Sequence, residues 1–315
     1  MSARSAGWVR ALAPAKINPF LAVLGTRADG YHELDTTLAA IDLCDVVAAR
    51  ASDAPGVTLA LSGPAASADV PRDERNLVVR AALGALELAN SLGQGARGVE
   101  LALEKHVPSQ AGLGGGSSDA AAAWLACATL FGCADHDEPA RRSLAALGSD
   151  CVFFWAARES GYARCRGRGE LVEPLPRLRR ERWLVIATPV QGAPTADVYR
   201  AFSRSSTGLD DVPSIRTEAL ELGEAAARAA CFNGLERAAL SAVPELALWR
   251  RMLDELACGH FRLSGSGSSF FGLFDERPAA RATAERLTRE CSQRSLALRE
   301  VRVVSFAGHG ARIVP

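Results

Sequence analysis

Lysine is almost absent from this sequence of 315 residues. Only two of its 36 basic residues are lysines, Lys16 and Lys105, and the others are arginines. Because no lysine follows Lys105, the glycine-rich segment after it cannot be a Walker A loop, which ends in Gly-Lys-Ser or Gly-Lys-Thr. A lysine offers a compact ammonium where an arginine offers a bulky planar fork. The two lysines are either chance survivors or, as we expect, residues at sites that arginine cannot occupy.

Long apolar runs, paired cysteines and a net charge are absent too. No apolar run approaches the roughly 20 residues that cross a membrane, and the basic N-terminal segment is too short for a signal peptide. The eight cysteines form no Cys-x-x-Cys pair and the five histidines are isolated, so we expect reduced thiols and no structural zinc site. The formal net charge of zero disfavours nucleic acid as the main partner. We therefore predict a cytoplasmic protein whose partners include neither nucleic acid nor a membrane.

The densest basic segment is the run from Arg177 to Arg182. It stands between a proline turn and an apolar stretch that we interpret as a strand. A solvated connector explains this run better than a patch for a polyanion does.

A glycine-rich segment carries the strongest functional signal. Four glycines, Gly112 and Gly114 to Gly116, follow a strand-like run at residues 99–104 and precede an alanine-rich stretch of high helix propensity. Free backbone N–H groups at a helix start bind phosphate well, and Ser117 or Ser118 can cap that helix. A Rossmann fingerprint needs glycine or alanine where Ser117 stands. The segment therefore predicts a phosphate-binding loop, with a flexible surface turn as the alternative, and we expect a bulky residue at Gly115 to block phosphate while the fold survives.

A second candidate is the carboxylate of Asp150, at the end of Gly148-Ser-Asp. A kinase must cradle a triphosphate, neutralise it with Mg²⁺ and deprotonate or orient the acceptor hydroxyl. Asp150 beside the ammonium of Lys16 would be an ionised base. The alternative is that Asp150 only stops or caps a helix.

The order of predicted elements indicates an α+β chain that divides near residue 180. We expect residues 8–25 to form two short strands around a turn at Pro14. Pro19 also lies in a predicted strand, where proline fits only at an edge or a bulge. Further predicted helices are 76–92, 138–147, 195–202, 218–230, 244–257 and 278–291.

Together these motifs resemble the GHMP kinase superfamily. Its Pro-x-Lys-x-Asn segment, its glycine-rich loop and its late Gly/Ser loop match residues 14–18, 108–118 and 263–268. Within the superfamily the chain resembles the 4-diphosphocytidyl-2-C-methyl-D-erythritol kinase family. The most specific segment is Arg27-Ala-Asp-Gly-Tyr-His-Glu-Leu34, and the resemblance extends from about residue 13 to residue 307.

The resemblance implies both a fold and an activity. It implies an N-terminal ATP-binding domain of the ribosomal-protein-S5-like kind at residues 8–180, a C-terminal ferredoxin-like domain at 181–315, and a substrate site between them. The implied reaction uses ATP and Mg²⁺ to phosphorylate the C2 hydroxyl of a cytidine-diphosphate-linked methylerythritol, in the non-mevalonate pathway to isoprenoid precursors. Alternatives are another small-molecule GHMP kinase, for homoserine, mevalonate or a sugar, and a catalytically silent relative that binds nucleotide. Tyr31 and His32 argue against the first, and Lys16 and Asp150 against the second.

The resemblance also assigns roles by matching position. It makes Asp150 the catalytic carboxylate, with Lys16 as the cation beside it. The residues implied around ATP are Asn76, Lys105, Pro108, Gly112, Leu113, Gly114, Gly115, Gly116, Ser117 and Ser118. Those implied around the cytidine and methylerythritol groups are Asn18, Tyr31, His32, Thr195 and Tyr199. Two tyrosines can stack on a pyrimidine while a histidine hydrogen-bonds its edge, although a lone tyrosine is more often a packing residue.

Overall fold

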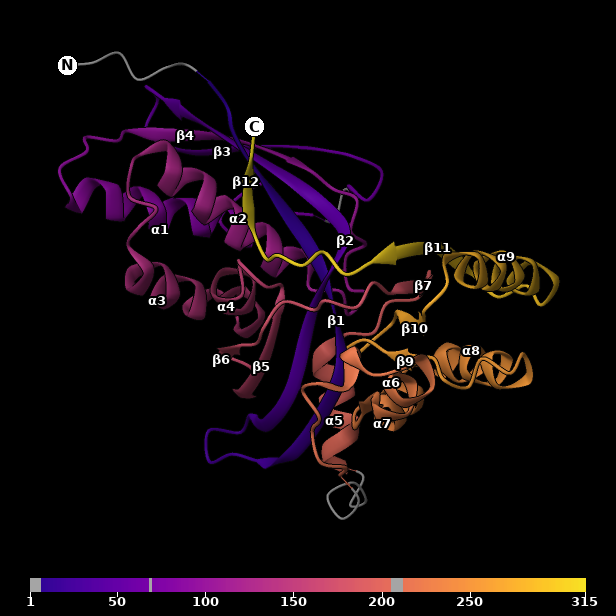
Figure 1. Ribbon diagram of the computed structural model, residues 1–315. Coiled ribbons are helices and arrows are strands. Elements are labelled where there is room, and N and C mark those ends of the chain that lie inside the picture. The colour runs from indigo at the N-terminus through magenta and orange to yellow at the C-terminus, as the bar shows by residue number, and fades with distance from the viewer. Residues whose placement is uncertain (1–6, 68–69, 205–211) are drawn as a thin grey trace.

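A computed structural model describes residues 7–67, 70–204 and 212–315 (Figure 1). Over these residues the chain forms two sheets with helices packed on them, which confirms the α+β prediction. The first sheet contains β1 (Val9–Thr26), β2 (His32–Ser52), β3 (Gly56–Ser62), β4 (Gly98–Glu104), β5 (Tyr162–Gly167), β6 (Leu171–Pro174), β8 (Phe232–Asn233) and β12 (Arg312–Val314). The second contains β7 (Trp183–Pro189), β9 (Arg262–Leu263), β10 (Phe270–Phe274) and β11 (Leu298–Ser305).

The helices divide between the two sheets. Those of the N-terminal part are α1 (Leu77–Ser91), α2 (Gly115–Leu130), α3 (Asp137–Leu147) and α4 (Ser149–Ala156). Those of the C-terminal part are α5 (Thr195–Arg204), the 3₁₀ turn η1 (Ala219–Glu221), α6 (Glu224–Ala230), α7 (Glu236–Ala242), α8 (Pro244–Glu255) and α9 (Arg277–Gln293). Of these, α4 and α7 were missed by the sequence patterns, and the helix expected at 218–230 is shorter because η1 and a break precede α6.

The first strand is one long element and not two. β1 pairs with β2 antiparallel along almost its whole length, and the register shifts between Pro14 and Ala15. A second shift lies between Ile17 and Phe20. Proline cannot donate to the sheet, so both Pro14 and Pro19 lie where a bulge interrupts the ladder. The predicted turn at Pro14 is therefore wrong, and of the two positions that we expected for Pro19, an edge or a bulge, the structure shows the bulge.

A core of small residues lies between the first sheet and its helices. In α2, 12 of the 16 residues are buried, since α1, α4, β1 and β2 all contact it (Figure 1). Alanine side chains let these elements approach closely, and Trp124 and Trp155 fill the wider spaces. The helix that follows the glycine loop is thus held on several sides, which fixes its N-terminus.

The two sheets share an interface near the glycine loop. Ile17 of β1, Leu113 of the loop, Ile186 of β7 and Phe271 of β10 belong to one buried cluster. The chain also returns to the first sheet after residue 180, because β8 pairs with β1 in parallel and β12 pairs with β1 antiparallel. No helix within residues 7–67, 70–204 and 212–315 has the length and apolar character needed to span a membrane.

Candidate functional site

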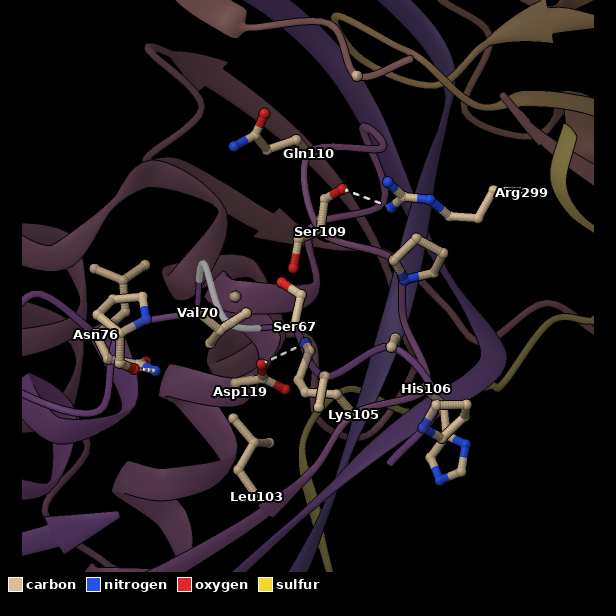
Figure 2. Close-up of a pocket in the computed structure, with 18 of the residues that line it drawn as sticks. Ser67, Val70, Asn76, Leu103, Lys105, His106, Ser109, Gln110, Asp119 and Arg299 are labelled. Carbon is tan, nitrogen blue, oxygen red and sulfur yellow. Dashed lines mark hydrogen bonds and ion pairs between the residues drawn. The ribbon is translucent and has the colours of Figure 1, made fainter. Parts of the chain in front are cut away.

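A large cleft opens beside the start of α2. Its volume is about 820 Å³, and four of the residues implied around ATP line it: Asn76, Lys105, Pro108 and Gly116. Figure 2 shows Asn76 and Val70 on one side of this cleft, with Ser109, Gln110 and Arg299 on the other. Arg299 comes from β11 and donates to the carbonyl oxygen of Ser109 at 3.2 Å, so the C-terminal part of the chain also contributes to the cleft. The sequence patterns had not indicated Arg299.

The glycine loop ends in an uncapped helix start. Gly112 and Gly114 have φ values of 73° and 68°, a conformation that favours glycine, and α2 begins at Gly115 directly after Gly114. Within the described residues, the backbone N–H groups of Gly114, Gly115, Gly116 and Ser117 donate to no protein acceptor. The expectation that Ser117 or Ser118 caps the helix is wrong, because both already lie inside its first turn. Unpaired N–H groups at a positive helix pole form an anion cradle.

The late Gly/Ser loop packs against the glycine loop and hydrogen-bonds to it. The Ser264 hydroxyl donates to the carbonyl oxygen of Gly112 at 2.8 Å, and the Ser269 N–H donates to that of Ala111 at 3.0 Å. A Cβ added to Gly112 would overlap the Ser264 carbonyl and lie 2.8 Å from that of Gly267. Only glycine at position 112 therefore lets the two loops approach this closely.

Gly115 and Gly116 face opposite sides of the helix start. A Cβ at Gly115 would lie 2.9 Å from the Val107 side chain and 3.3 Å from the Lys105 ammonium, both in the interior. A Cβ at Gly116 would meet nothing within 4 Å, and Gly116 lines the cleft. A bulky residue at Gly115 would therefore press on the interior, and the expectation that it blocks phosphate stays a prediction; Gly116, which lines the cleft, is the better position for that test.

Lys105 lies at the floor of the cleft in a buried ionic cluster. Its ammonium pairs with Asp119 at 2.7 Å and with Asp45, and all three side chains are at most 3% exposed (Figure 2). Asp45 also accepts the backbone N–H groups of His106 and Val107. Burial opposes the charge on Lys105, yet the two carboxylates raise its pKa above the ordinary value. Burial and the nearby Asp45 raise the pKa of Asp119, against the opposing effect of Lys105.

This cluster changes the interpretation of two sequence-predicted residues. With both carboxylates as partners, the Lys105 ammonium supports the floor of the cleft. Asn76 is the N-cap of α1: its side chain accepts from the Val78 N–H at 3.0 Å and donates to the Pro71 carbonyl at 2.7 Å. Asp45 and Asp119 were missed because nothing local marks a strand or helix aspartate as the partner of a distant lysine.

Lys16 and Asp150 meet at the other end of the glycine loop. The Lys16 ammonium lies 3.7 Å from the Asp150 carboxylate, and it donates to the Asn18 side chain at 2.6 Å and the Gly112 carbonyl at 3.0 Å. The Lys16 side chain is 5% exposed and that of Asp150 is 37% exposed. Burial lowers the pKa of Lys16, while Asp150 opposes that shift. Asp150 lies in the first turn of α4, so it begins a helix and does not end one.

A second cleft lies beside this pair. Its volume is about 730 Å³, and Tyr31, His32, Thr195 and Tyr199 line it. The rings of His32 and Tyr199 lie 4.9 Å apart, and the Arg168 guanidinium lies 4.7 Å from the centre of the exposed Tyr31 ring. Burial and the charge of Asp150 raise the pKa of Tyr199, which places Tyr199 near Asp150. Asn18 does not line this cleft: its side chain is buried and joins Lys16 to Thr36.

The late Gly/Ser loop also connects this second cleft to Lys16. The hydroxyls of Thr195 and Ser266 lie 3.0 Å apart. A Cβ at the adjacent Gly265 would lie 3.2 Å from the Lys16 ammonium and 3.3 Å from the Asn18 side chain. Lys16 and Asp150 thus lie between an anion cradle and an aromatic cleft. That arrangement can join a phosphate donor to an acceptor bound on the other side.

Comparison with known proteins agrees with this geometry. Residues 76–156 match the family model for the N-terminal domain of GHMP kinases, and residues 212–293 match the model for their C-terminal domain. A 4-diphosphocytidyl-2-C-methyl-D-erythritol kinase of Cereibacter sphaeroides is 42% identical over 286 residues, covering 89% of this chain and 94% of that protein. One of Pelotomaculum thermopropionicum is 38% identical over 289 residues, covering 90% and 96%. The chain belongs to this family of GHMP kinases.

Solved structures show the same relationship. A crystal structure of a 4-(cytidine 5'-diphospho)-2C-methyl-D-erythritol kinase superposes with a TM-score of 0.73 at 35% identity, covering 95% of this chain and 99% of that one. A homoserine kinase from Cytophaga hutchinsonii reaches a TM-score of 0.71 at 20% identity, covering 100% and 99%. At that identity the second match shows the GHMP kinase fold alone.

Proposed function

We propose that this GHMP kinase transfers the γ-phosphate of ATP to the C2 hydroxyl of 4-diphosphocytidyl-2-C-methyl-D-erythritol, a step in the non-mevalonate route to isoprenoid precursors. The observation that carries the proposal is the position of Lys16 and Asp150, 3.7 Å apart and between the cradle and the aromatic cleft. The homologous kinases, at 38% and 42% identity over most of both chains, support the choice of substrate.

In this proposal ATP binds along the first cleft. The triphosphate lies against the free N–H groups of Gly114 to Ser117, where the helix pole adds a favourable partial charge. The adenosine lies toward Asn76, Lys105 and Pro108, which line the same cleft. Asn76 and Lys105 act here by shaping the walls, since their polar atoms already have protein partners.

Mg²⁺ fits at this cradle as an ion held mainly by phosphate oxygens and water. Among the described residues, no group of three histidine, cysteine, aspartate or glutamate side chains is placed to hold a metal. The oxygen atoms that fit a hard cation here are the Ser118 hydroxyl and one carboxylate oxygen of Asp119, both buried without a hydrogen-bond partner. When bound, Mg²⁺ neutralises charge on the triphosphate.

Asp150 then acts on the acceptor. A tertiary alcohol is a weak nucleophile at neutral pH, so its proton must be accepted as its oxygen bonds to the γ-phosphorus. The Asp150 carboxylate takes that proton, and the bond between the γ-phosphorus and the bridging oxygen breaks to release ADP. The Lys16 ammonium, fixed by Asn18 and Gly112, stabilises negative charge on the transferring group.

The second cleft provides surfaces for a cytidine group. Tyr31 and Tyr199 present aromatic faces suited to a pyrimidine, and His32 provides a hydrogen-bonding edge. The Nε2 atom of His32 lies 3.0 Å from the Ser203 hydroxyl, so this serine orients the ring. A polar edge of this kind discriminates because the wrong base leaves its groups unpaired.

The test is ATP consumption with a panel of acceptors. We expect turnover with 4-diphosphocytidyl-2-C-methyl-D-erythritol and a far lower kcat/KM with methylerythritol phosphate, homoserine or mevalonate. Equal efficiency with an acceptor that lacks cytidine contradicts the substrate assignment. ATP binding without turnover of any acceptor supports a silent relative instead.

A further inference from the structure

The basic run at residues 177–182 separates into two groups in the structure. Arg180 and Arg182 pair with Asp275 at 2.6 and 3.2 Å, so their charges are locally compensated. Arg177 forms no salt bridge with any described residue, and it lines a separate cavity of about 340 Å³. We call this cavity the arginine pocket; Arg158, Arg177, His309 and Arg312 line it.

Positive charge outweighs negative charge in the arginine pocket. Like Arg177, neither Arg158 nor Arg312 forms a salt bridge within 4 Å with any residue in the described part of the chain. Asp137, which does not line the pocket, lies near enough to Arg158 for their charges to attract. Glu159 is the one carboxylate among the lining residues. The lining residues therefore carry three guanidinium groups and one carboxylate. A guanidinium fork matches the oxygens of a phosphate group.

The backbone and two side chains hold this pocket in place. The Arg158 guanidinium lies 3.9 Å from the centre of the Trp155 ring, and the indole N–H of Trp155 donates to Asp137 at 2.7 Å. A Cβ at Gly308, whose φ is 66°, would lie 2.5 to 2.8 Å from the Arg177 guanidinium. Glycine at 308 thus leaves the space that Arg177 occupies.

The segment after β11 is fastened to the end of α4. The Gly310 N–H donates to the carbonyl of Arg158 at 3.1 Å, and the Ala311 N–H to that of Phe154 at 2.9 Å. From there β12 pairs with the edge of β1, and Figure 1 shows β12 running beside α2. The arginine groups therefore converge from three separate segments that the fold fixes relative to one another.

His309 adds a hydrogen-bonding group to the pocket. Its Nδ1 atom lies 2.7 Å from the carbonyl oxygen of Gly310, and no described residue bonds its Nε2 atom. Burial lowers the pKa of His309, and the guanidiniums of Arg312 and Arg177 lower it further, while the Gly310 carbonyl opposes the shift. An anion bound between these groups would offset the lowering of the His309 pKa by the two arginines.

We propose that the arginine pocket binds a phosphate or diphosphate group of a small molecule. The guanidiniums of Arg158, Arg177 and Arg312 and the His309 ring supply the contacts, and about 340 Å³ admits a diphosphate with a short organic part. The pocket is distinct from the candidate active site, because Asp150 lies in the first turn of α4 whereas Arg158 follows its last turn, roughly 12 Å away along the helix.

Inorganic pyrophosphate is the first probe, titrated calorimetrically into the full chain and into the variant Gly116→Val. The valine side chain projects into the first cleft and obstructs the glycine loop, so pyrophosphate binding that persists in this variant belongs to another site. We expect Arg177→Gln and Arg312→Gln each to weaken this binding by about tenfold. Arg179→Gln is the matched control, since it removes a charge from the same run outside the pocket, and it should change affinity by less than about twofold.

His309 gives a second readout that does not depend on the glycine loop. In NMR titrations, with His309→Gln used to assign the signal, we expect pyrophosphate to raise the pKa of His309 in the wild type but not in Arg177→Gln. Methyl diphosphate distinguishes two sources of the ligand, because both probes would contact the same arginines. Tighter binding of methyl diphosphate than of pyrophosphate indicates that the ligand is an organic metabolite. Weaker binding indicates that the ligand is the free anion.

Three results overturn the proposal. These are no binding of either probe by the wild type, pyrophosphate binding that a folded Gly116→Val variant loses completely, and equal weakening by all three arginine variants. None of the results tests phosphate transfer, so failure here leaves the proposed kinase reaction intact. Conversely, the His309 titration stands even if the glycine loop binds no phosphate.

Discussion

At the scale of single residues, the two lysines serve different purposes. Lys16 contacts Asp150 across the candidate active site, whereas Lys105 lies between two buried carboxylates. Both sites are narrow. A Cβ at Gly114 would lie 2.9 Å from Cγ of Lys16, and one at Gly115 would lie 3.3 Å from the Lys105 ammonium. Compact ammonium groups fit such spaces, which gives a physical reason for lysine at both positions in an arginine-rich chain.

Asp150→Asn should lower kcat by about 10²–10⁴-fold, the usual contribution of a general base. The amide keeps the shape of the carboxylate but cannot accept the hydroxyl proton. ATP affinity should stay within about twofold of the wild type, since Asp150 is not in the cradle. Steady-state kinetics and nucleotide titration measure the two effects. A near-normal kcat in the folded variant would remove Asp150 from the mechanism.

Lys16→Arg should lower kcat by about 10²-fold while the protein stays folded. The larger fork cannot occupy the space bounded by Gly114 and Gly265 and still bond both Asn18 and Gly112. Comparing kcat of Lys16→Arg with that of Lys16→Met tests this argument. If the arginine enzyme matched the wild type, charge alone would be the requirement.

Lys105→Ala should lower the free energy of unfolding by about 3–5 kcal/mol, because it leaves two buried carboxylates without their shared cation. Asp119→Asn is the control: it removes one negative charge and still leaves Lys105 paired with Asp45. Asp119→Asn should therefore lower the free energy of unfolding by less than Lys105→Ala does. Denaturant unfolding measures both variants, and equal stability of Lys105→Ala and the wild type would contradict a structural role for the cluster.

At the scale of secondary-structure elements, the residue at which α2 begins determines which backbone N–H groups of the glycine loop are unpaired. The helix begins at Gly115, so its first three residues present unpaired N–H groups, and the αL conformation of Gly114 turns the chain into that first turn. The sequence showed that a helix follows the glycines. It did not show on which residue the helix begins, because glycine and serine both occur at helix starts.

Gly116→Val should weaken ATP binding by about tenfold or more, which equals about 1.4 kcal/mol, with little loss of stability. Its side chain would project into the first cleft where the phosphates approach. Gly115→Val is the contrast, since overpacking against Val107 should cost about 1–3 kcal/mol of folding stability. Nucleotide titration and denaturant unfolding separate the two effects. Unchanged ATP affinity in Gly116→Val would show that the phosphates lie elsewhere.

At the scale of the whole molecule, the C-terminal part completes structures that begin in the N-terminal part. The late Gly/Ser loop bonds the glycine loop, Arg299 bonds Ser109, and β12 covers the edge of β1. Stability of the second sheet and its helices therefore bears directly on the site. In that region His260 packs against Phe261 and Phe274, and its Nε2 atom is buried without a hydrogen-bond partner.

The free energy of unfolding should decrease as the pH falls from about 6.5 toward 4. Burial, with the charges of Arg228, Arg262 and Arg250, lowers the pKa of His260 from 6.5 to about 4. The unfolded chain therefore binds this proton at a higher pH than the folded protein does, so acid favours unfolding in that window. His260→Leu should remove this part of the pH dependence, which denaturant unfolding at several pH values would show. An unchanged pH profile would mean that other groups cause it.

The sequence by itself determined the family and pointed to the glycine-rich loop and to Lys16 and Asp150 as a candidate pair. Each of these signals depends on local residue types: a cluster of glycines before a helix, a rare lysine, and an aspartate after Gly-Ser. The tertiary structure decided which glycine faces the cleft, which carboxylates hold Lys105, that β1 continues through Pro14, and that Arg177 joins Arg158 and Arg312. These features depend on contacts between segments far apart in the chain, and local residue preferences carry no information about such contacts.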